Sequence, residues 1–192
     1  MVLPEKEDIK TTKIIFMGNV AVGMTSIIHT FLEGRNLRHA RSLGTGDLYR
    51  IIEVNEGGQR HKVKLNIWDT PGDASTHNLP HLFLREVQVA VLVYSITSKP
   101  SFDDLEQWIE QIEDNNEDYL LFLVGNKSDL TDQRVVPSIF GDYMVRNHAK
   151  AKSFRKTSVV NDVESILALF DEIGKEVVRL GTFKPQRNST RL

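Results

Sequence analysis

The feature that most constrains this chain is a regular alternation of short apolar runs with longer amphipathic stretches. Two of the runs, 87–94 and 119–124, are apolar almost throughout, which is typical of parallel strands covered on both faces. The stretches between the runs repeat apolar residues at helical spacing. Strands that alternate with helices predict an α/β fold with a doubly wound, mostly parallel sheet and helices on both faces.

The remaining segments fit the same plan. A strand at 13–17 leads through a glycine loop into a helix at 25–32. Strands at 48–54 and 62–68, joined by a turn at 55–58, predict a hairpin that puts one antiparallel strand at the sheet edge. The other expected elements are a helix at 102–112 capped by Ser101, helices at 137–148 and 163–180, and a short edge strand at 153–157.

The composition fits one domain and excludes several classes of site. The chain has 192 residues, of which 40% are hydrophobic, enough for one packed core. Its net charge of -2 argues against nucleic-acid binding, which needs an excess of basic residues. The absence of cysteine excludes disulfides, thiolate metal sites and prenyl or palmitoyl anchors. We expect a domain at 1–181 and a short polar tail at 182–192.

The N-terminal segment carries no targeting signal. It has neither an apolar signal region nor a glycine at position 2 for myristoylation, and no apolar run is long enough to cross a membrane. We therefore expect a monomeric, cytoplasmic protein with no transmembrane segment and no lipid anchor of its own. Such a protein would reach membranes only peripherally, through partners.

A glycine loop follows the first expected strand. Residues 18–25 read G-N-V-A-V-G-M-T, which is the phosphate-loop spacing G-x-x-x-x-G-K-[ST] with Met24 at the lysine position. In such a loop, backbone NH groups and the helix N-terminus hold phosphates. Taken alone, the loop is equally consistent with a simple turn between a strand and a helix. The candidate binding residues are Asn19, Val20, Ala21, Val22, Gly23, Met24, Thr25 and Ser26.

Three further segments follow other expected strands: Trp68-Asp69-Thr70-Pro71-Gly72, Asn126-Lys127-Ser128-Asp129 and Thr157-Ser158-Val159. They resemble the W-D-T-A-G, N-K-x-D and T-S-A elements of the Ras-superfamily small GTPases, and they occur in that family's order. The segments 94–102 and 107–109 are similar to the Rab branch, and the resemblance covers residues 10–180. It implies a P-loop small G domain with a six-stranded sheet that binds GTP or GDP with Mg²⁺.

The resemblance also implies how the base is recognised. The carboxylate of Asp129 would accept hydrogen bonds from N1 and N2 of guanine, a pattern that adenine does not offer. Asn126 would brace this loop and reach the base, and Lys127 would lay its aliphatic stem over the purine. The O6 side would be closed by the last segment, Thr157, Ser158 and Val159.

A metal site and two switch segments follow from the same resemblance. The hydroxyl of Thr25 would bind Mg²⁺ directly, and Asp69 would hold it through a water molecule. A second hydroxyl would come from Ser42, with Thr45 as the alternative. Gly72 would give its NH to the γ-phosphate, a contact that lets its segment change order with the nucleotide state.

Three residues depart from the family's hydrolytic apparatus. Met24 replaces the cation that stabilises charge on the transferred phosphoryl group. Val20 stands where most of the superfamily has a glycine or serine, and it would crowd the attacking water. Asp73 stands at the position of the water-positioning glutamine, where its carboxylate would repel the γ-phosphate.

We therefore expect a guanine-nucleotide-binding switch with slow or impaired GTP hydrolysis. It would act on effector and regulator proteins through the two switch segments. One alternative is a pseudo-GTPase that has lost its nucleotide and serves as a protein-interaction scaffold. Another is a fully active GTPase in which Lys13, Lys10 or a partner supplies the missing charge.

Overall fold

The computed structural model describes residues 9–33, 48–70 and 79–181. Within these ranges, six strands form one sheet in the order β2-β3-β1-β4-β5-β6. β2 is antiparallel to β3, and every other neighbouring pair is parallel. The strands are β1 (Lys10–Met17), β2 (Leu48–Glu56), β3 (Gln59–Asp69), β4 (Val89–Ser95), β5 (Leu120–Asn126) and β6 (Ala151–Thr157). The predicted fold class, with its antiparallel edge strand, is confirmed.

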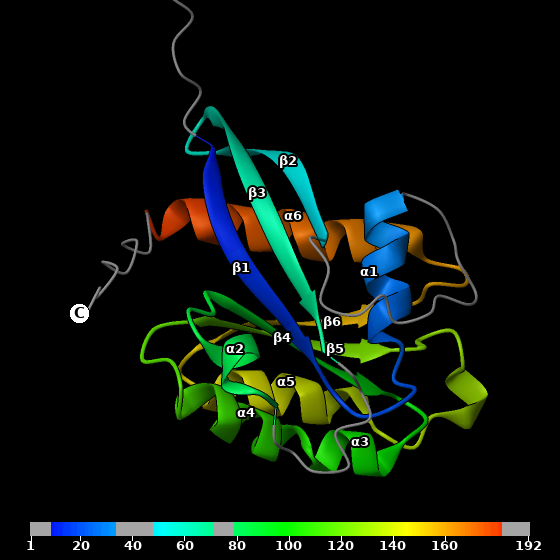
Figure 1. Cartoon of the computed structure of the whole chain (residues 1–192). Helices are drawn as coiled ribbons and strands as arrows, with labels where there is room; N and C mark the ends of the chain where they lie inside the picture. The colour runs from blue at the N-terminus through cyan, green and yellow to red at the C-terminus, as the bar shows by residue number, and fades with distance from the viewer. Residues whose placement is uncertain (1–8, 34–47, 71–78, 182–192) are drawn as a thin grey trace, which may run out of the picture.

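Helices cover both faces of the sheet (Figure 1). α1 (Met24–Glu33) and α6 (Val163–Arg179) lie on one face. The other face carries α2 (His81–Leu84), α3 (Lys99–Asp103), α4 (Leu105–Glu113) and α5 (Ser138–Asn147). A single 3₁₀ turn, η1 (Thr131–Gln133), precedes α5 in the chain. The short elements α2 and η1 are absent from the sequence-based prediction.

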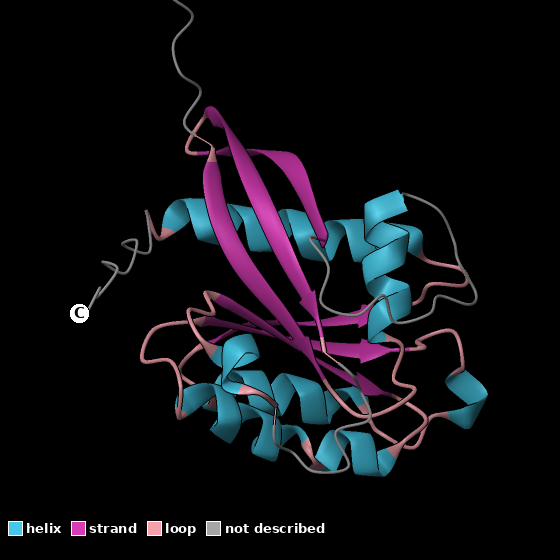
Figure 2. Ribbon diagram, in the orientation of Figure 1, coloured by secondary structure: helices cyan, strands magenta, loops and turns pink. Residues whose placement is uncertain are grey.

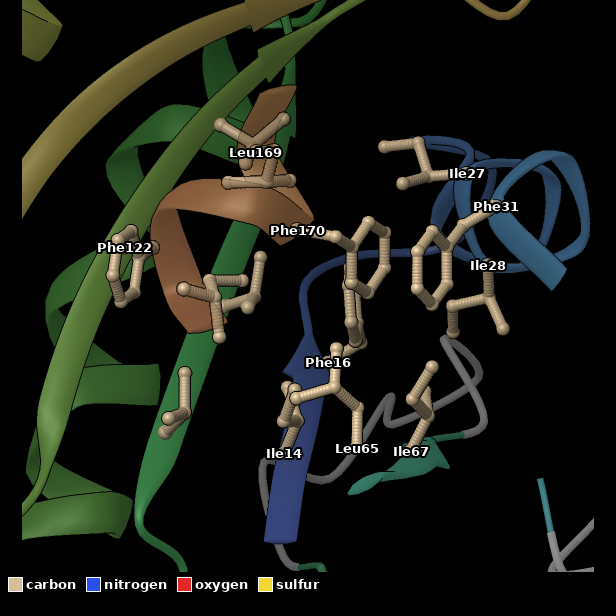
Figure 3. Packing of buried hydrophobic residues seen from close by; sticks show 14 of the residues in the cluster. Ile14, Phe16, Ile27, Ile28, Phe31, Leu65, Ile67, Phe122, Leu169 and Phe170 are labelled. Atoms are coloured by element: carbon tan, nitrogen blue, oxygen red, sulfur yellow. The ribbon is translucent and has the colours of Figure 1, made fainter. Parts of the chain in front are cut away.

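β1 contributes side chains to two hydrophobic cores, one on each face of the sheet. Its alternate side chains point to opposite faces, as the two-residue period of a strand requires. Ile14 and Phe16 belong to the core that includes α1 and α6, and Ile15 and Met17 belong to the core on the other face. Figure 3 shows the first core, in which the rings of Phe16 and Phe170 stack with centroids 5.8 Å apart. This packing fixes the end of β1 from which the glycine loop starts.

The hairpin is tighter than the sequence predicts. Asn55 and Glu56 were expected in the turn, but both extend β2 and pair with β3. The turn consists of Gly57 and Gly58 alone, with φ of +59° and +76°. Such left-handed conformations at both central positions are what a two-residue hairpin turn needs, and glycine adopts them without strain.

The expected helix at 102–112 is also different in the structure. It is split into α3 and α4 at Asp104, and its first part begins three residues earlier. The N-cap is Ser98, whose Oγ accepts a hydrogen bond from the backbone N of Ser101 at 3.4 Å. Ser101 itself is buried inside α3, where its hydroxyl donates to the carbonyl of Ser98 at 2.8 Å. The prediction of Ser101 as the cap was therefore wrong.

Candidate nucleotide-binding site

The predicted binding segments meet at the carboxyl ends of the parallel strands. Because β1, β3, β5 and β6 run in the same direction, the loops after them leave from the same side (Figure 2). The glycine loop ends at Met24, where α1 begins. The first hydrogen bond of the helix runs from Ile27 N to Gly23 O, at 3.1 Å. The NH groups of the first helical turn have no acceptor within the helix. They are therefore free to bind an anion.

Asn126, the last residue of β5, joins the glycine loop to the predicted base-recognition segments. It is 1% exposed; its Nδ2 donates to the carbonyl of Val22 at 2.8 Å, and its Oδ1 accepts from Thr157 Oγ1 at 3.0 Å. Gly23 makes this approach possible, because its φ is +99° and a Cβ there would overlap Asn126 Nδ2. The two halves of the predicted site are thus one hydrogen-bonded unit.

The carboxylate of Asp129 is held in place by Ser158. The buried Ser158 Oγ donates to Asp129 Oδ1 at 2.6 Å and accepts from the backbone N of Val160 at 3.1 Å. Lys127, two residues before Asp129, has a φ of +63°, a left-handed conformation that is costly for a residue with a Cβ. The side chain of Val159 packs against the core that includes α1 and α6. The predicted base-recognition segments are therefore held in place by hydrogen bonds within the protein.

Thr25 and Asp69 lie together, as the predicted metal site requires. Thr25 Oγ1 donates to Asp69 Oδ2 at 2.7 Å, and Asp69 is only 4% exposed. Burial raises the pKa of this carboxyl, while the hydrogen bond from Thr25 and the charge of His29 act in the opposite direction. Its other oxygen, Oδ1, is buried with no hydrogen-bond partner.

This arrangement fits Mg²⁺. A divalent cation would satisfy the unpartnered Asp69 Oδ1, and Mg²⁺ prefers hydroxyl and carboxylate oxygens. Across the described ranges, no group of three or more His, Cys, Asp or Glu side chains is placed to hold a metal. A cation at Thr25 and Asp69 would therefore need further oxygens, which nucleotide phosphates would supply.

The Asp69→Asn variant tests this site. A raised pKa means that folded wild-type protein, without nucleotide or metal, loses stability as the pH rises through the folded-state pKa of Asp69. The variant removes this buried charge, so we expect it to melt at a higher temperature than wild type at pH 7.5 and at nearly the same temperature in acid. We also expect it to lose any Mg²⁺-dependent rise in melting temperature. A variant less stable than wild type at pH 7.5 would contradict this account.

Met24 puts an apolar side chain where the phosphate-loop pattern has a cation. It is 5% exposed and belongs to the core that includes Ile27, Ile28 and Phe31 of the same helix. The spacing of these residues continues the apolar face of α1 by one more turn. The replacement has therefore extended the core at the expense of charge in the loop.

The lysines proposed from sequence as substitutes lie elsewhere. Lys13 Nζ donates to the carbonyls of Leu82 and Arg85, at 3.1 and 2.6 Å, and lies 4.2 Å from the centroid of the Trp68 ring. Desolvation in this setting lowers its pKa to about 8. Lys10 starts β1, about 25 Å from the glycine loop at roughly 3.3 Å per residue. Neither side chain lies at the glycine loop.

The glycine loop is also tied to α4, which the sequence did not predict. Asn19 Nδ2 donates to Asp104 Oδ2 at 2.6 Å, and the indole nitrogen of Trp108 donates to Asn19 Oδ1 at 3.1 Å. The one feature of the sequence that could have indicated this contact is Trp108 itself, because the NH of a buried tryptophan needs a hydrogen-bond acceptor. Beyond Asn19, Val20 is 65% exposed at the loop tip, and Ala21 has a strained φ of +62°.

Several predicted residues lie outside the described ranges. These are the switch hydroxyls Ser42 and Thr45, the γ-phosphate contact Gly72, the altered water-positioning residue Asp73 and the tail at 182–192. Ser26 lies in the first turn of α1, where its NH is placed for the predicted role.

Comparison with known proteins agrees with the geometry. The Ras family profile matches residues 13–179. The chain is 32% identical over 181 residues to Ras-related protein Rab-26 of Rattus norvegicus. The aligned stretch covers 94% of this chain and 68% of Rab-26. It is 33% identical over 168 residues to Rab-37 of Homo sapiens, covering 87% and 73% of the two chains. Rab-10 of Caenorhabditis elegans is 31% identical over 161 residues, with coverage of 83% and 77%.

Within the described part of the chain, the helices are too short or too polar for any of them to span a bilayer. The four sequence elements, the sheet order and the family match all point to one assignment. The chain therefore belongs to the Ras family of small GTPases and is Rab-like.

Proposed function

We propose that this protein is a guanine-nucleotide switch that binds GTP and GDP with Mg²⁺ and hydrolyses GTP slowly. Ras-family GTPases bind guanine nucleotides, generally with Mg²⁺. The observation that carries the proposal is the double hydrogen bonding of Asn126, which joins the phosphate-binding loop to the base-recognition segments. A scaffold that binds no nucleotide would not need this hydrogen-bonded link between the glycine loop and the base-recognition segments.

The base-recognition segments account for selectivity. Asp129 is fixed by Ser158, so a guanine with its N1 and N2 donors meets a carboxylate that needs no reorganisation. Adenine offers no donor at its N1, and its binding would leave the carboxylate unpaired. Lys127 precedes Asp129 by two residues in the chain, and its aliphatic stem would cover the purine.

The phosphate side supports binding more than catalysis. The NH groups of the first turn of α1 and the hydroxyl of Thr25 are in place, whereas Met24 is buried in the core. Loss of the cation removes transition-state stabilisation, usually the largest catalytic contribution. Val20 and Asp73 add crowding and repulsion by their side-chain chemistry. Hydrolysis is therefore slow even where nucleotide is held.

The alternative, a nucleotide-free pseudo-GTPase scaffold, is favoured by one specific observation. Met24 completes a hydrophobic face and leaves the loop without its usual cation. In either case the partners would be effector and regulator proteins that contact the switch segments. By analogy with Rab proteins, we place this activity in membrane traffic, for a monomeric cytoplasmic protein that reaches membranes peripherally through those partners.

The Asp129→Ala variant tests the proposed function. Purified wild-type protein is expected to retain GDP or GTP on extraction, and the variant is expected to bind guanine nucleotides at least about 100-fold more weakly. Fluorescence titration with a labelled GDP measures the affinity, and single-turnover assays measure hydrolysis. Asp132→Ala is the matched control, because Asp132 is an exposed carboxylate three residues away. Equal GDP affinity in wild type and Asp129→Ala would overturn the assignment of the base.

A further inference from the structure

The side chain of Asn19, the second residue of the glycine loop, is hydrogen-bonded at both ends to the start of α4. Its Nδ2 donates to Asp104 Oδ2 at 2.6 Å, and its Oδ1 accepts from Trp108 Nε1 at 3.1 Å. Asp104 and Trp108 are four residues apart, so they lie on the same side of the helix. The start of α4 thus offers one acceptor and one donor that match the two ends of the amide.

Both partners of Asn19 are placed by α4. Trp108 is 1% exposed, and its ring belongs to the core on the face of the sheet that carries this helix. Asp104 stands at the N-cap of α4, where a carboxylate commonly accepts from the NH groups of the first turn, but its side chain makes no such hydrogen bond. The carboxylate bonds the glycine loop in place of its own helix.

The hydrogen bonds to Asn19 fix one end of a strained turn. Val22 N donates to Asn19 O at 3.5 Å, which closes a four-residue turn whose third residue, Ala21, has a φ of +62°. A residue with a Cβ keeps this conformation only where its surroundings hold it. The other end of the turn is held by Asn126, whose Nδ2 donates to Val22 O. The turn is therefore held from α4 on one side and from β5 on the other.

The shape of this turn is important because the loop has lost its usual cation. Met24 is buried in the core, so the loop would attract phosphate mainly through backbone NH groups. Such groups bind an anion when they point to a common place, and holding them there in advance removes an ordering cost on binding. A contact that fixes the turn therefore favours phosphate binding without touching the phosphate.

We propose that Asp104 and Trp108 are positioning residues for the phosphate groups of the nucleotide. Acting through Asn19, they hold the glycine loop in the form that binds a diphosphate or triphosphate. The inference rests on the proposed function, because it assigns the loop to nucleotide phosphates. Loss of the contact weakens the phosphate side of the site and leaves base recognition intact, since Asp129 is held by Ser158.

The test compares GDP with guanosine, which has the same base and no phosphate, on the full chain. We expect Asn19→Ala and Asp104→Ala each to weaken GDP binding at least about 10-fold and to change the Kd of guanosine less than about 2-fold. Asp104→Asn also removes the charge but keeps an acceptor, so it should recover most of the GDP affinity. Displacement of a labelled GDP measures both ligands. Glu106→Ala is the matched control, because Glu106 is an exposed carboxylate in the first turn of α4, and it should change neither Kd.

Hydrogen exchange measures the same coupling from the other side. If the hydrogen bond from Trp108 strengthens phosphate binding, phosphate binding must strengthen that hydrogen bond by the same factor. GDP should therefore slow exchange of the Trp108 indole proton about 10-fold more than guanosine does. Both ligands are used at the same ratio of concentration to Kd, so that they stabilise the whole fold equally. Trp68→Phe identifies the signal, because the chain has two tryptophans.

The outcomes separate this inference from the proposed function. Equal losses of GDP and guanosine affinity in Asn19→Ala would mean that the contact serves only the fold, and an unchanged GDP affinity would mean that it does not position the loop. Either result overturns the role of Asp104 and Trp108 and leaves the proposed function standing. Asp104→Ala, at a partly exposed position, carries the test if Asn19→Ala does not fold. If wild-type protein does not bind GDP, both proposals fail.

Discussion

Replacing Asn126 by alanine is expected to lower the free energy of unfolding by about 3 kcal/mol and to abolish nucleotide retention. The substitution removes the donor to Val22 O and the acceptor for Thr157 Oγ1, both in a buried setting. Each group left without a partner costs about 1–3 kcal/mol. The loss also unlinks the phosphate loop from the base-recognition segments, so binding should fall by more than stability alone explains.

Urea unfolding measures the stability, and GDP titration measures the binding. Asn161→Ala is the matched control, because Asn161 is exposed in the loop before α6, and it should change neither quantity appreciably. If Asn126→Ala were as stable as wild type and bound GDP equally well, the link between the two loops would have no energetic importance.

A double-mutant cycle isolates the contact of Asn126 with Gly23. Gly23→Ala should destabilise by about 1–3 kcal/mol more than Gly57→Ala. Both glycines have positive φ, but a Cβ on Gly57 meets nothing within 4 Å, whereas one on Gly23 overlaps Asn126 Nδ2. In the Asn126→Ala background this excess should disappear. A cost of Gly23→Ala that is independent of Asn126 would contradict the contact.

Replacing Met24 by lysine is expected to raise the affinity for GDP and GTP by about 10- to 100-fold, since hydrogen bonds from a charged donor are worth about 1.5–3 kcal/mol. The same variant should lose stability without nucleotide, because position 24 is buried in the core and an unpaired ammonium there is costly. Opposite effects on the empty and loaded protein are the signature of a restored cation. Single-turnover assays should show faster GTP hydrolysis as well.

Met24→Leu is the matched control for that variant, because it keeps the volume and the apolar character of the side chain. It should leave both stability and nucleotide affinity close to wild type. The missing charge would not be what limits binding if leucine and lysine gave the same affinity.

The sequence predicts the sheet well because each buried strand is recognisable from its own run of apolar residues. β4 and β5 are buried along their whole length, so their sequences lack polar residues until Ser95 and Asn126 at their ends and mark the parallel sheet. β1 begins at Lys10, earlier than its apolar run, because Lys10, Thr11 and Thr12 pair with β3 despite their polarity. That extension depends on register with a partner strand. No local pattern contains this information.

The same distinction applies to the site. The spacing of the glycine loop predicts Thr25 as a metal ligand, and the structure brings its hydroxyl to Asp69. The hydrogen bond from Trp108 to Asn19 depends on packing between segments far apart in the chain. A single sequence identifies polar residues at such positions without showing what they face.

The most direct test of the central claim is calorimetric titration of nucleotide-stripped wild-type protein with GDP in the presence of Mg²⁺, with ADP titrated in parallel. A carboxylate already fixed by Ser158 and the NH groups of the first turn of α1 predict measurable heat and a higher melting temperature with GDP, and neither with ADP at the same concentration. Equal responses to the two nucleotides, or no response to GDP at millimolar concentration, would contradict the account.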